Sequence, residues 1–223
     1  MHINTVSPIL YFGTPVVLIS TLNEDGSYNL APMSSVFWLG WRCMLGLAAI
    51  SKTTQNMIRT GECVLNLTSV NEVAAVNRPA LTTGSNPVPE FKSGMGYRHV
   101  ADKFAIAGLS PMASETVAPP RVKECPVQLE ASVAATHGVG DDNPAQRGFI
   151  FCIETRIQRV YADEAILMNG ERDRIDPDKW RPLMMSFQQF YGLGARLQHS
   201  RLGTIPERMY RSPDMALARQ LRR

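Results

Sequence analysis

Short β-prone segments that alternate with tight turns are the feature that most constrains this fold. Residues 11–21 (YFGTPVVLIST) contain a continuous apolar run typical of a buried strand, and residues 28–37 return after a turn at 23–27. Asp25 and Gly26 suit this turn because glycine readily adopts the positive φ angles of short hairpin loops. Further strands are predicted at residues 42–49, 62–67, 128–135 and 148–162.

Helices are predicted only in the connections between these strands. Residues 53–60 indicate a short helix that ends at Gly61, and residues 70–76 and 97–107 have helical spacing. Asp176, followed by Pro177, predicts the start of a helix through residue 187. The tail, 213–223, is predicted to form a last short helix. This order favours a barrel-like α+β domain that is mainly β.

Composition narrows the class of protein. With 223 residues, 44% of them hydrophobic and 19% charged, the chain can bury the core of one domain, with or without additions. The net charge of +3 is too small to indicate a nucleic-acid or membrane partner. Neither a membrane-spanning run nor a secretory signal is predicted. Four cysteines without a CxxC pair favour buried free thiols in a reducing compartment, so we expect a cytoplasmic protein.

Residues 29–56 contain the candidate binding site. The loop at 51–56 (SKTTQN) opens the predicted helix and offers backbone N–H groups, hydroxyls and one ammonium where an anion is stabilised. Ahead of it, Ala31, Pro32, Ser34 and Ser35 leave little side-chain bulk, so a flat ligand can lie against the backbone. The combination suggests a phosphorylated, planar cofactor.

An ordinary strand-to-helix turn is the alternative interpretation of the loop at 51–56. In that case Ser51 or Thr53 is the N-cap and Lys52 is solvated. The pattern by itself favours this alternative, because serine and threonine are common N-cap residues.

No side chain is marked out as a catalyst. The chain lacks GxGxxG, GxxxxGK[ST] and GxSxG motifs, so an NTPase, a Rossmann-type enzyme or a serine hydrolase finds no support. The four histidines have no metal-ligand spacing, and no carboxylate pair stands out. We therefore predict no metal site and no catalytic residue. Trp38 and Trp41 are expected in the core, although they could also cover a ligand face.

Several segments, in this order and spacing, resemble the flavin reductase-like family of FMN-binding split barrels, in particular its flavoredoxin-type branch. They are residues 15–35, 51–57, 61–67, 101–111, 119–131 and 180–194. The resemblance implies a six-stranded antiparallel split β-barrel with short peripheral helices, spanning residues 1–202. A basic C-terminal extension, 203–223, comes after it. Residues 38–43 replace an apolar run that many family members carry, and the tail beyond residue 202 has no family counterpart.

The resemblance also implies a site for FMN near the interface of a homodimer. The ring would lie along Asn29, Leu30, Ala31, Pro32, Met33, Ser34 and Ser35. The ribityl phosphate would be held by Ser51, Lys52, Thr53, Thr54 and Asn56. His99 and residues 102–104 fall in a connection that would lie near the cofactor or the partner subunit.

The implied activity is that of an FMN-binding oxidoreductase, either an NAD(P)H-dependent flavin reductase or a flavoredoxin-like electron carrier. NADH or NADPH would supply hydride, and the flavin would pass electrons to a small-molecule acceptor or a partner oxygenase. Two alternatives remain open. One is a non-catalytic FMN-binding storage or sensor protein. The other is a split-barrel oxidase or reductase for another substrate, such as a pyridoxal phosphate precursor or a deazaflavin.

Overall fold

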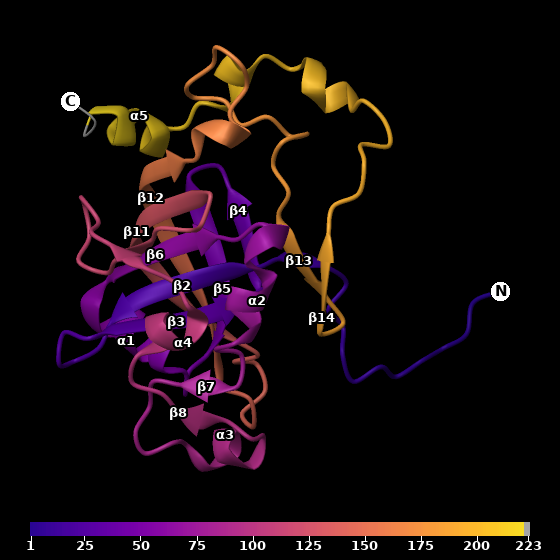
Figure 1. Cartoon of the computed structure of the whole chain (residues 1–223). Helices are drawn as coiled ribbons and strands as arrows, with labels where there is room; N and C mark the ends of the chain where they lie inside the picture. Colours follow the sequence, from indigo (N-terminus) through magenta and orange to yellow (C-terminus); the bar gives the residue numbers. More distant parts are fainter. Residues whose placement is uncertain (221–223) are drawn as a thin grey trace.

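One seven-stranded antiparallel sheet forms the body of the protein, whose computed structural model describes residues 1–220 (Figure 1). Its strand order is β3-β2-β6-β11-β12-β5-β4. In chain order the strands are β2 (Val17–Leu22), β3 (Tyr28–Met33), β4 (Val36–Leu39), β5 (Arg42–Ala48), β6 (Glu62–Leu67), β11 (Val127–Val139) and β12 (Ile150–Ala162). The predicted mainly β, α+β class is confirmed.

The prediction of six strands is wrong, because residues 28–37 form two strands instead of one. β3 and β4 are separated only by Ser34 and Ser35, yet they lie at opposite edges of the sheet. A two-residue link cannot span an open sheet of seven strands, since neighbouring strands lie about 4.8 Å apart. The sheet therefore curls until its two edges meet.

Gly46 on β5 makes room for this link. Its N–H donates to the Ser35 carbonyl at 2.8 Å, and a Cβ at Gly46 would lie 3.2 Å from the Ser35 Cβ. A larger residue would push the link away from β5.

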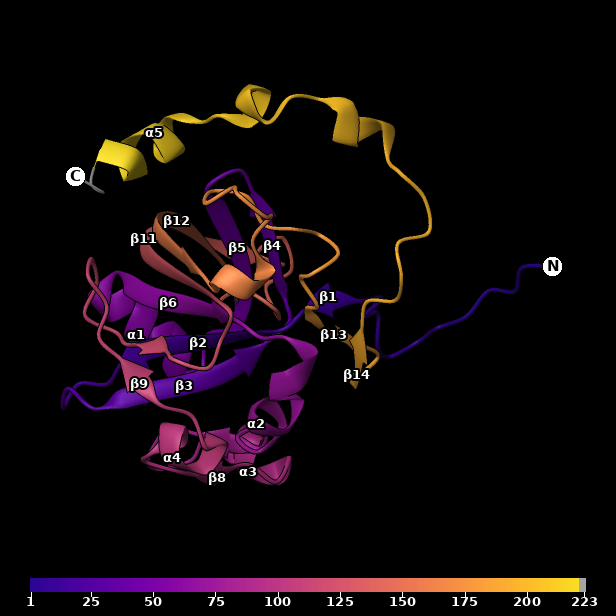
Figure 2. The same ribbon diagram turned by 45° about the horizontal axis from the view of Figure 1, so that its top comes forward.

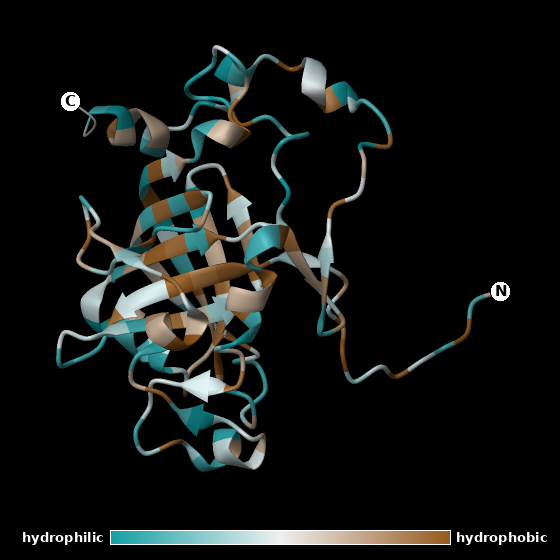
Figure 3. Ribbon diagram, in the orientation of Figure 1, coloured by the Kyte–Doolittle hydropathy of each residue, from teal (hydrophilic) through white to brown (hydrophobic). Residues whose placement is uncertain are grey.

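Strand β2 is buried on both faces, which explains its unbroken apolar sequence. Val17 and Ile19 face the barrel interior with Leu45, Leu65 and Ile153. Leu18, on the opposite face of β2, packs in a second cluster beneath two helices, with partners that include Val16, Leu30, Val76 and Phe104. Figure 3 shows hydrophobic residues concentrated in the barrel strands.

The helices are short and lie at the periphery. They are α1 (Lys52–Thr60), α2 (Val73–Asn77), α3 (Glu90–Gly94), α4 (Lys103–Ala107) and α5 (Pro213–Gln220), with single 3-10 turns such as Val70–Glu72. The helix predicted at 53–60 is confirmed, and Gly61 ends it with a φ of 73°. The helical prediction at 70–76 is also confirmed. Of the predicted helix at 97–107, only α4 forms, because residues 98–99 pair with 82–83 as the short strands β8 (Arg98–His99) and β7 (Thr82–Thr83).

The helix predicted at 176–187 is wrong. Asp176 caps a single turn by accepting from the Asp178 N–H at 2.8 Å, but Pro182 cannot continue a helix. The chain instead forms a hairpin of β13 (Leu183–Ser186) and β14 (Gln189–Gly192), and β13 also pairs with β1 (Thr14–Pro15). Phe187 and Gln188 turn this hairpin with positive φ angles of 45° and 64°.

β9 (Pro111–Met112) pairs with β10 (Arg121–Val122). After β14 the chain arcs past the barrel to α5, which lies beside β12 (Figure 2). The predicted tail helix is confirmed over 213–220, and residues 221–223 lie outside the described part of the chain. Asp214 of α5 accepts two hydrogen bonds from Arg42, at 2.8 and 3.2 Å.

The predicted free thiols are confirmed in the described residues. Cys43, Cys63 and Cys125 are buried and Cys152 is half-buried, and none is in a disulfide. Burial raises the pKa of Cys43 to about 12, so this thiol stays protonated. Within residues 1–220, no helix combines the length and apolar character that crossing a bilayer requires.

We predict that Leu65→Ala lowers the free energy of unfolding by about 2–5 kcal/mol, because it leaves a cavity in the fully buried barrel core. Leu197→Ala is the control, since that side chain is fully exposed. Urea unfolding followed by circular dichroism measures both. Equal midpoints for the two variants would contradict the assignment of Leu65 to the core.

Candidate functional site

The N-terminus of α1 is left open. Ser51 precedes the helix in an extended conformation, its hydroxyl makes no capping hydrogen bond, and the first turn carries no acidic residue. The Gln55 N–H donates to the Ser51 carbonyl at 3.0 Å, so the three preceding amides have no carbonyl one turn back to bond. Such an end carries partial positive charge and N–H donors for an anion.

Lys52 adds a full charge at this helix end. Its side chain is 17% exposed, and its Nζ donates to the Glu24 carboxylate at 2.6 Å. This hydrogen bond lowers the pKa of Glu24. Lys52 is therefore held against the hairpin turn. The ordinary-turn interpretation would instead require it to extend into solvent.

Two buried asparagines join α1 to the first hairpin. The Asn29 Nδ2 donates to the hydroxyls of Thr21 and Thr53, at 3.2 and 3.0 Å. The Asn56 Nδ2 donates to Thr21 Oγ1 at 3.1 Å and to Asn23 Oδ1 at 2.9 Å. These bonds fix where the helix begins relative to β2 and β3.

The predicted phosphate residues therefore divide into two groups. Ser51 and Lys52 are half-buried and lie at the open helix end. Thr53, Thr54 and Asn56 are buried and use their side chains internally; the Thr54 hydroxyl donates to the Ala48 carbonyl at 2.8 Å. The Thr53 hydroxyl accepts from Asn29, so its O–H can still donate to a ligand, as can the backbone amides of the first turn.

A buried acceptor without a partner faces the same place. Asn29 Oδ1 has no hydrogen bond among the described residues. A Cβ placed on Gly84 would lie 2.8 Å from this oxygen and 3.2 Å from Lys52 Cγ. Gly84 thus packs closely against Asn29 and Lys52, and even a methyl group at this position would be too large.

The loop around Gly84 contributes more unsatisfied polar atoms. Ser85 Oγ and His99 Nδ1 are also buried without a partner in the part of the chain described. Parallel pairing of β7 and β8 places His99 beside Thr83, next to Gly84. Buried polar groups without partners are uncommon and often mark a site completed by a ligand or water. Sequence reasoning did not identify Gly84 and Ser85, since only the length of their loop marked them.

The predicted platform coincides with an edge strand. Asn29 and Leu30 are buried, Ala31, Pro32, Met33 and Ser34 are half-buried, and Ser35 is exposed. Because β3 pairs only with β2 among residues 1–220, its other edge keeps backbone groups that no strand of this range occupies. Pro32 is compatible with such an edge position.

Trp38 and Trp41 pack against the barrel core, as the core interpretation predicted. Trp38 also keeps a buried Nε1 without a hydrogen-bond partner among the described residues. The neighbouring side chains of Phe37 and Leu39 are exposed.

Lys103 lies beneath the Gly84 loop. It is 3% exposed and donates to the Thr82 carbonyl at 3.3 Å. Burial, followed by the nearby charge of Lys92, lowers the pKa of Lys103 to about 8. Phe104, the next residue, packs edge-on against Tyr28 with ring centroids 6.1 Å apart, which joins α4 to β3.

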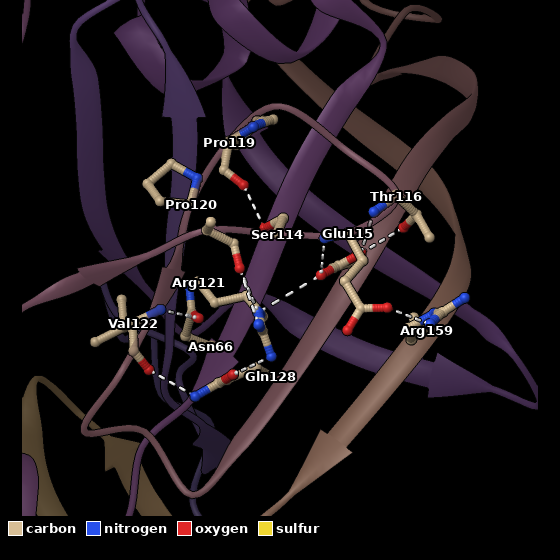
Figure 4. Close-up of polar contacts among 12 residues, drawn as sticks. Asn66, Ser114, Glu115, Thr116, Pro119, Pro120, Arg121, Val122, Gln128 and Arg159 are labelled. Carbon is tan, nitrogen blue, oxygen red and sulfur yellow. Dashed lines mark hydrogen bonds and ion pairs between the residues drawn. The ribbon is translucent and has the colours of Figure 1, made fainter. Parts of the chain in front are cut away.

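A second buried polar cluster joins β11 and β6 to the loop at 113–122 (Figure 4). The fully buried Glu130 accepts from the N–H groups of Glu115 and Thr116, at 2.9 and 2.7 Å, and Arg121 Nε lies 3.6 Å from its carboxylate. Asn66 Oδ1 accepts from the Val122 N–H at 2.8 Å. The Glu130 and Asn66 acceptors are satisfied by the chain itself, so they hold the loop at 113–122 in place.

A match to a family model defines the class of protein. The model of the flavin reductase-like domain matches residues 9–193, and the chain belongs to this family.

Among relatives, the uncharacterized protein YdfE of Bacillus subtilis is 37% identical over 83% of this chain and 86% of its own length. Flavoredoxin of Desulfovibrio vulgaris is similar in structure, with a TM-score of 0.71, 20% identity, and coverage of 90% of this chain and 98% of that one. Nitrilotriacetate monooxygenase component B from Bacillus cereus has a TM-score of 0.67, 20% identity, and coverage of 84% and 88%.

Because the folded-state pKa of Lys103 is lowered, the unfolded chain binds more protons between about pH 8 and pH 10.5. We predict that stability lost by burying the ammonium is regained as pH rises through this window. Relative to Lys103→Met, the wild-type protein should gain about 3 kcal/mol of unfolding free energy between pH 7 and pH 10.5.

Urea unfolding of the two proteins across this range measures the difference. Lys123→Met, at an exposed position, controls for loss of a lysine. A wild-type-to-Lys103→Met difference that stays constant with pH would contradict a buried, desolvated ammonium.

Proposed function

We propose that the protein binds FMN at the open end of α1 and acts as an FMN-dependent oxidoreductase. Family membership supports a flavin. The main structural support for a phosphate and ribityl site is the uncapped helix end at Lys52. The unpartnered Asn29 Oδ1 lies next to it, beside Gly84 and the Lys52 stem.

The donors and acceptors of this site suit FMN in kind. The Lys52 ammonium and the first-turn amides offset the charge of a phosphate. Asn29 Oδ1 is an acceptor in need of a donor, which a ribityl hydroxyl supplies. The free edge of β3 and the link after it, together Asn29 to Ser35, offer backbone groups to the polar rim of a flat ring system. Thr53, Thr54 and Asn56 hold the helix end in position.

In more detail, we propose that the protein acts as an NAD(P)H-dependent flavin reductase or as a flavoredoxin-like electron carrier. When bound, FMN supplies hydride acceptance from NADH or NADPH and onward electron transfer. In this proposal the chain binds and orients the cofactor, and no side chain acts as a catalyst. Likeness to a monooxygenase component favours a partner oxygenase as one electron acceptor, with a small molecule as the other candidate.

We also propose a cytoplasmic homodimer. Phe12 and Phe187 form an edge-on pair, 5.1 Å between centroids, that remains exposed together with Leu10 and Tyr191. A second copy would cover this apolar surface, and light scattering after gel filtration would measure its mass. Four free thiols fit a reducing compartment.

Anaerobic addition of NADH and NADPH to the protein reconstituted with FMN tests the activity. We expect the flavin absorbance near 450 nm to bleach with one of them. Tight FMN without bleaching would support the storage or sensor alternative. A different cofactor, identified by mass after extraction, would support the alternative of a split-barrel oxidase or reductase for another substrate. Failure to bind FMN at all would overturn the proposal.

Lys52→Ala should weaken FMN binding by about 1–3 kcal/mol, through loss of a charge-assisted contact to the phosphate. Titration of flavin fluorescence measures the affinity. Lys123→Ala, which removes the same charge at an exposed position far along the chain, is the matched control. Equal affinities of the two variants would mean that Lys52 does not contact the phosphate.

A further inference from the structure

The first hairpin lies along one face of α1. Lys52, Asn56 and Arg59, spaced by one and two helical turns, bond to the hairpin at Glu24, Asn23 and the Leu22 carbonyl, respectively. Asn56 and Arg59 anchor the base of the turn. This arrangement places the Glu24 carboxylate at the N-terminal end of the helix. There it pairs with Lys52, the only charged side chain of the first helical turn.

Glu24 therefore sits where the proposed phosphate would bind. Its carboxylate is 2.6 Å from the Lys52 Nζ, and an anion on the same ammonium would meet a like charge within a few ångströms. The two partners differ in freedom, since the Glu24 side chain is 58% exposed and that of Lys52 only 17%. Glu24 can turn into water while Lys52 stays in place.

A second observation, independent of the helix end, marks the space as a ligand site. Asn29 is 1% exposed, and its unpartnered Oδ1 lies beside the backbone of Gly84, next to the Lys52 stem. The Glu24–Lys52 pair does not satisfy this oxygen. The site is thus incomplete even while Glu24 holds the ammonium.

We propose that Glu24 is a built-in competitor for the phosphate of FMN. Its carboxylate pairs with the Lys52 ammonium when no phosphate is bound, and it turns away when the phosphate binds. This inference rests on the proposed function, and it makes the affinity for FMN lower than the site would otherwise allow. The flavin is then held as an exchangeable ligand. The loss of affinity caused by Glu24 concerns only the contact of the phosphate with Lys52.

Binding of FMN and of riboflavin, which lacks the phosphate, separates this effect from others. By fluorescence titration, Glu24→Gln should tighten FMN about tenfold, as removal of one nearby like charge allows, and change riboflavin by less than about twofold. Asp25→Asn is the matched control, because it removes a charge from the same turn while its side chain bonds to Ser27 and not to Lys52. Its effect on FMN should stay below about threefold.

Unchanged or weaker FMN binding by Glu24→Gln would overturn the proposal. Equal tightening of riboflavin would overturn it too, because the effect would then not involve the phosphate.

Inorganic phosphate gives a readout that needs no flavin. It should raise the melting temperature of Glu24→Gln more than that of the wild type, because a ligand stabilises according to its affinity. If the wild type fails to bind FMN and riboflavin but phosphate still discriminates the two proteins, the proposed function fails and the competitor role stands. Equal phosphate stabilisation of both would refute the competitor role.

Discussion

The two-residue link at Ser34 and Ser35 is the constraint on which the rest of the structure depends. It joins strands at opposite edges of a seven-stranded sheet, so the sheet must close on itself. Closure depends on Gly46, whose missing side chain lets the link lie against β5. Once the barrel is closed, β2 lies between two apolar layers, which accounts for its unbroken run of buried residues.

The site depends on the same geometry. β3 becomes an edge strand, and its start meets α1 where Asn29 and Asn56 bond to Thr21. The two asparagines and their side-chain partners fix the helix end, which leaves Lys52 and the first-turn amides to interact with a ligand. The Gly84 loop completes the enclosure from a segment far along the chain.

Much of this could be predicted from local sequence. The apolar run of β2, the turn at Asp25 and Gly26, and the helix ended by Gly61 each depend on neighbouring residues, and so does the position of Lys52 at a helix start. The split of residues 28–37 could not be predicted, because both halves are equally β-prone and only closure separates them. The prediction that Asp176 and Pro177 begin a helical turn is right. Pro182 and the pairing of β13 with β1 then make the next segment a hairpin instead of a helix. Gly84 and Ser85 reach the site through tertiary contacts that no local pattern encodes.

The segment that leads to α5 depends on a different kind of force. Arg196 pairs with Asp178 and Arg174 with Glu207, and all four side chains are largely exposed. Pairs of this kind contribute little and are screened within about 8 Å at physiological ionic strength. The barrel is held by apolar contacts that salt does not weaken. Ionic strength therefore acts on the outer segment that leads to α5 and leaves the apolar core of the barrel intact.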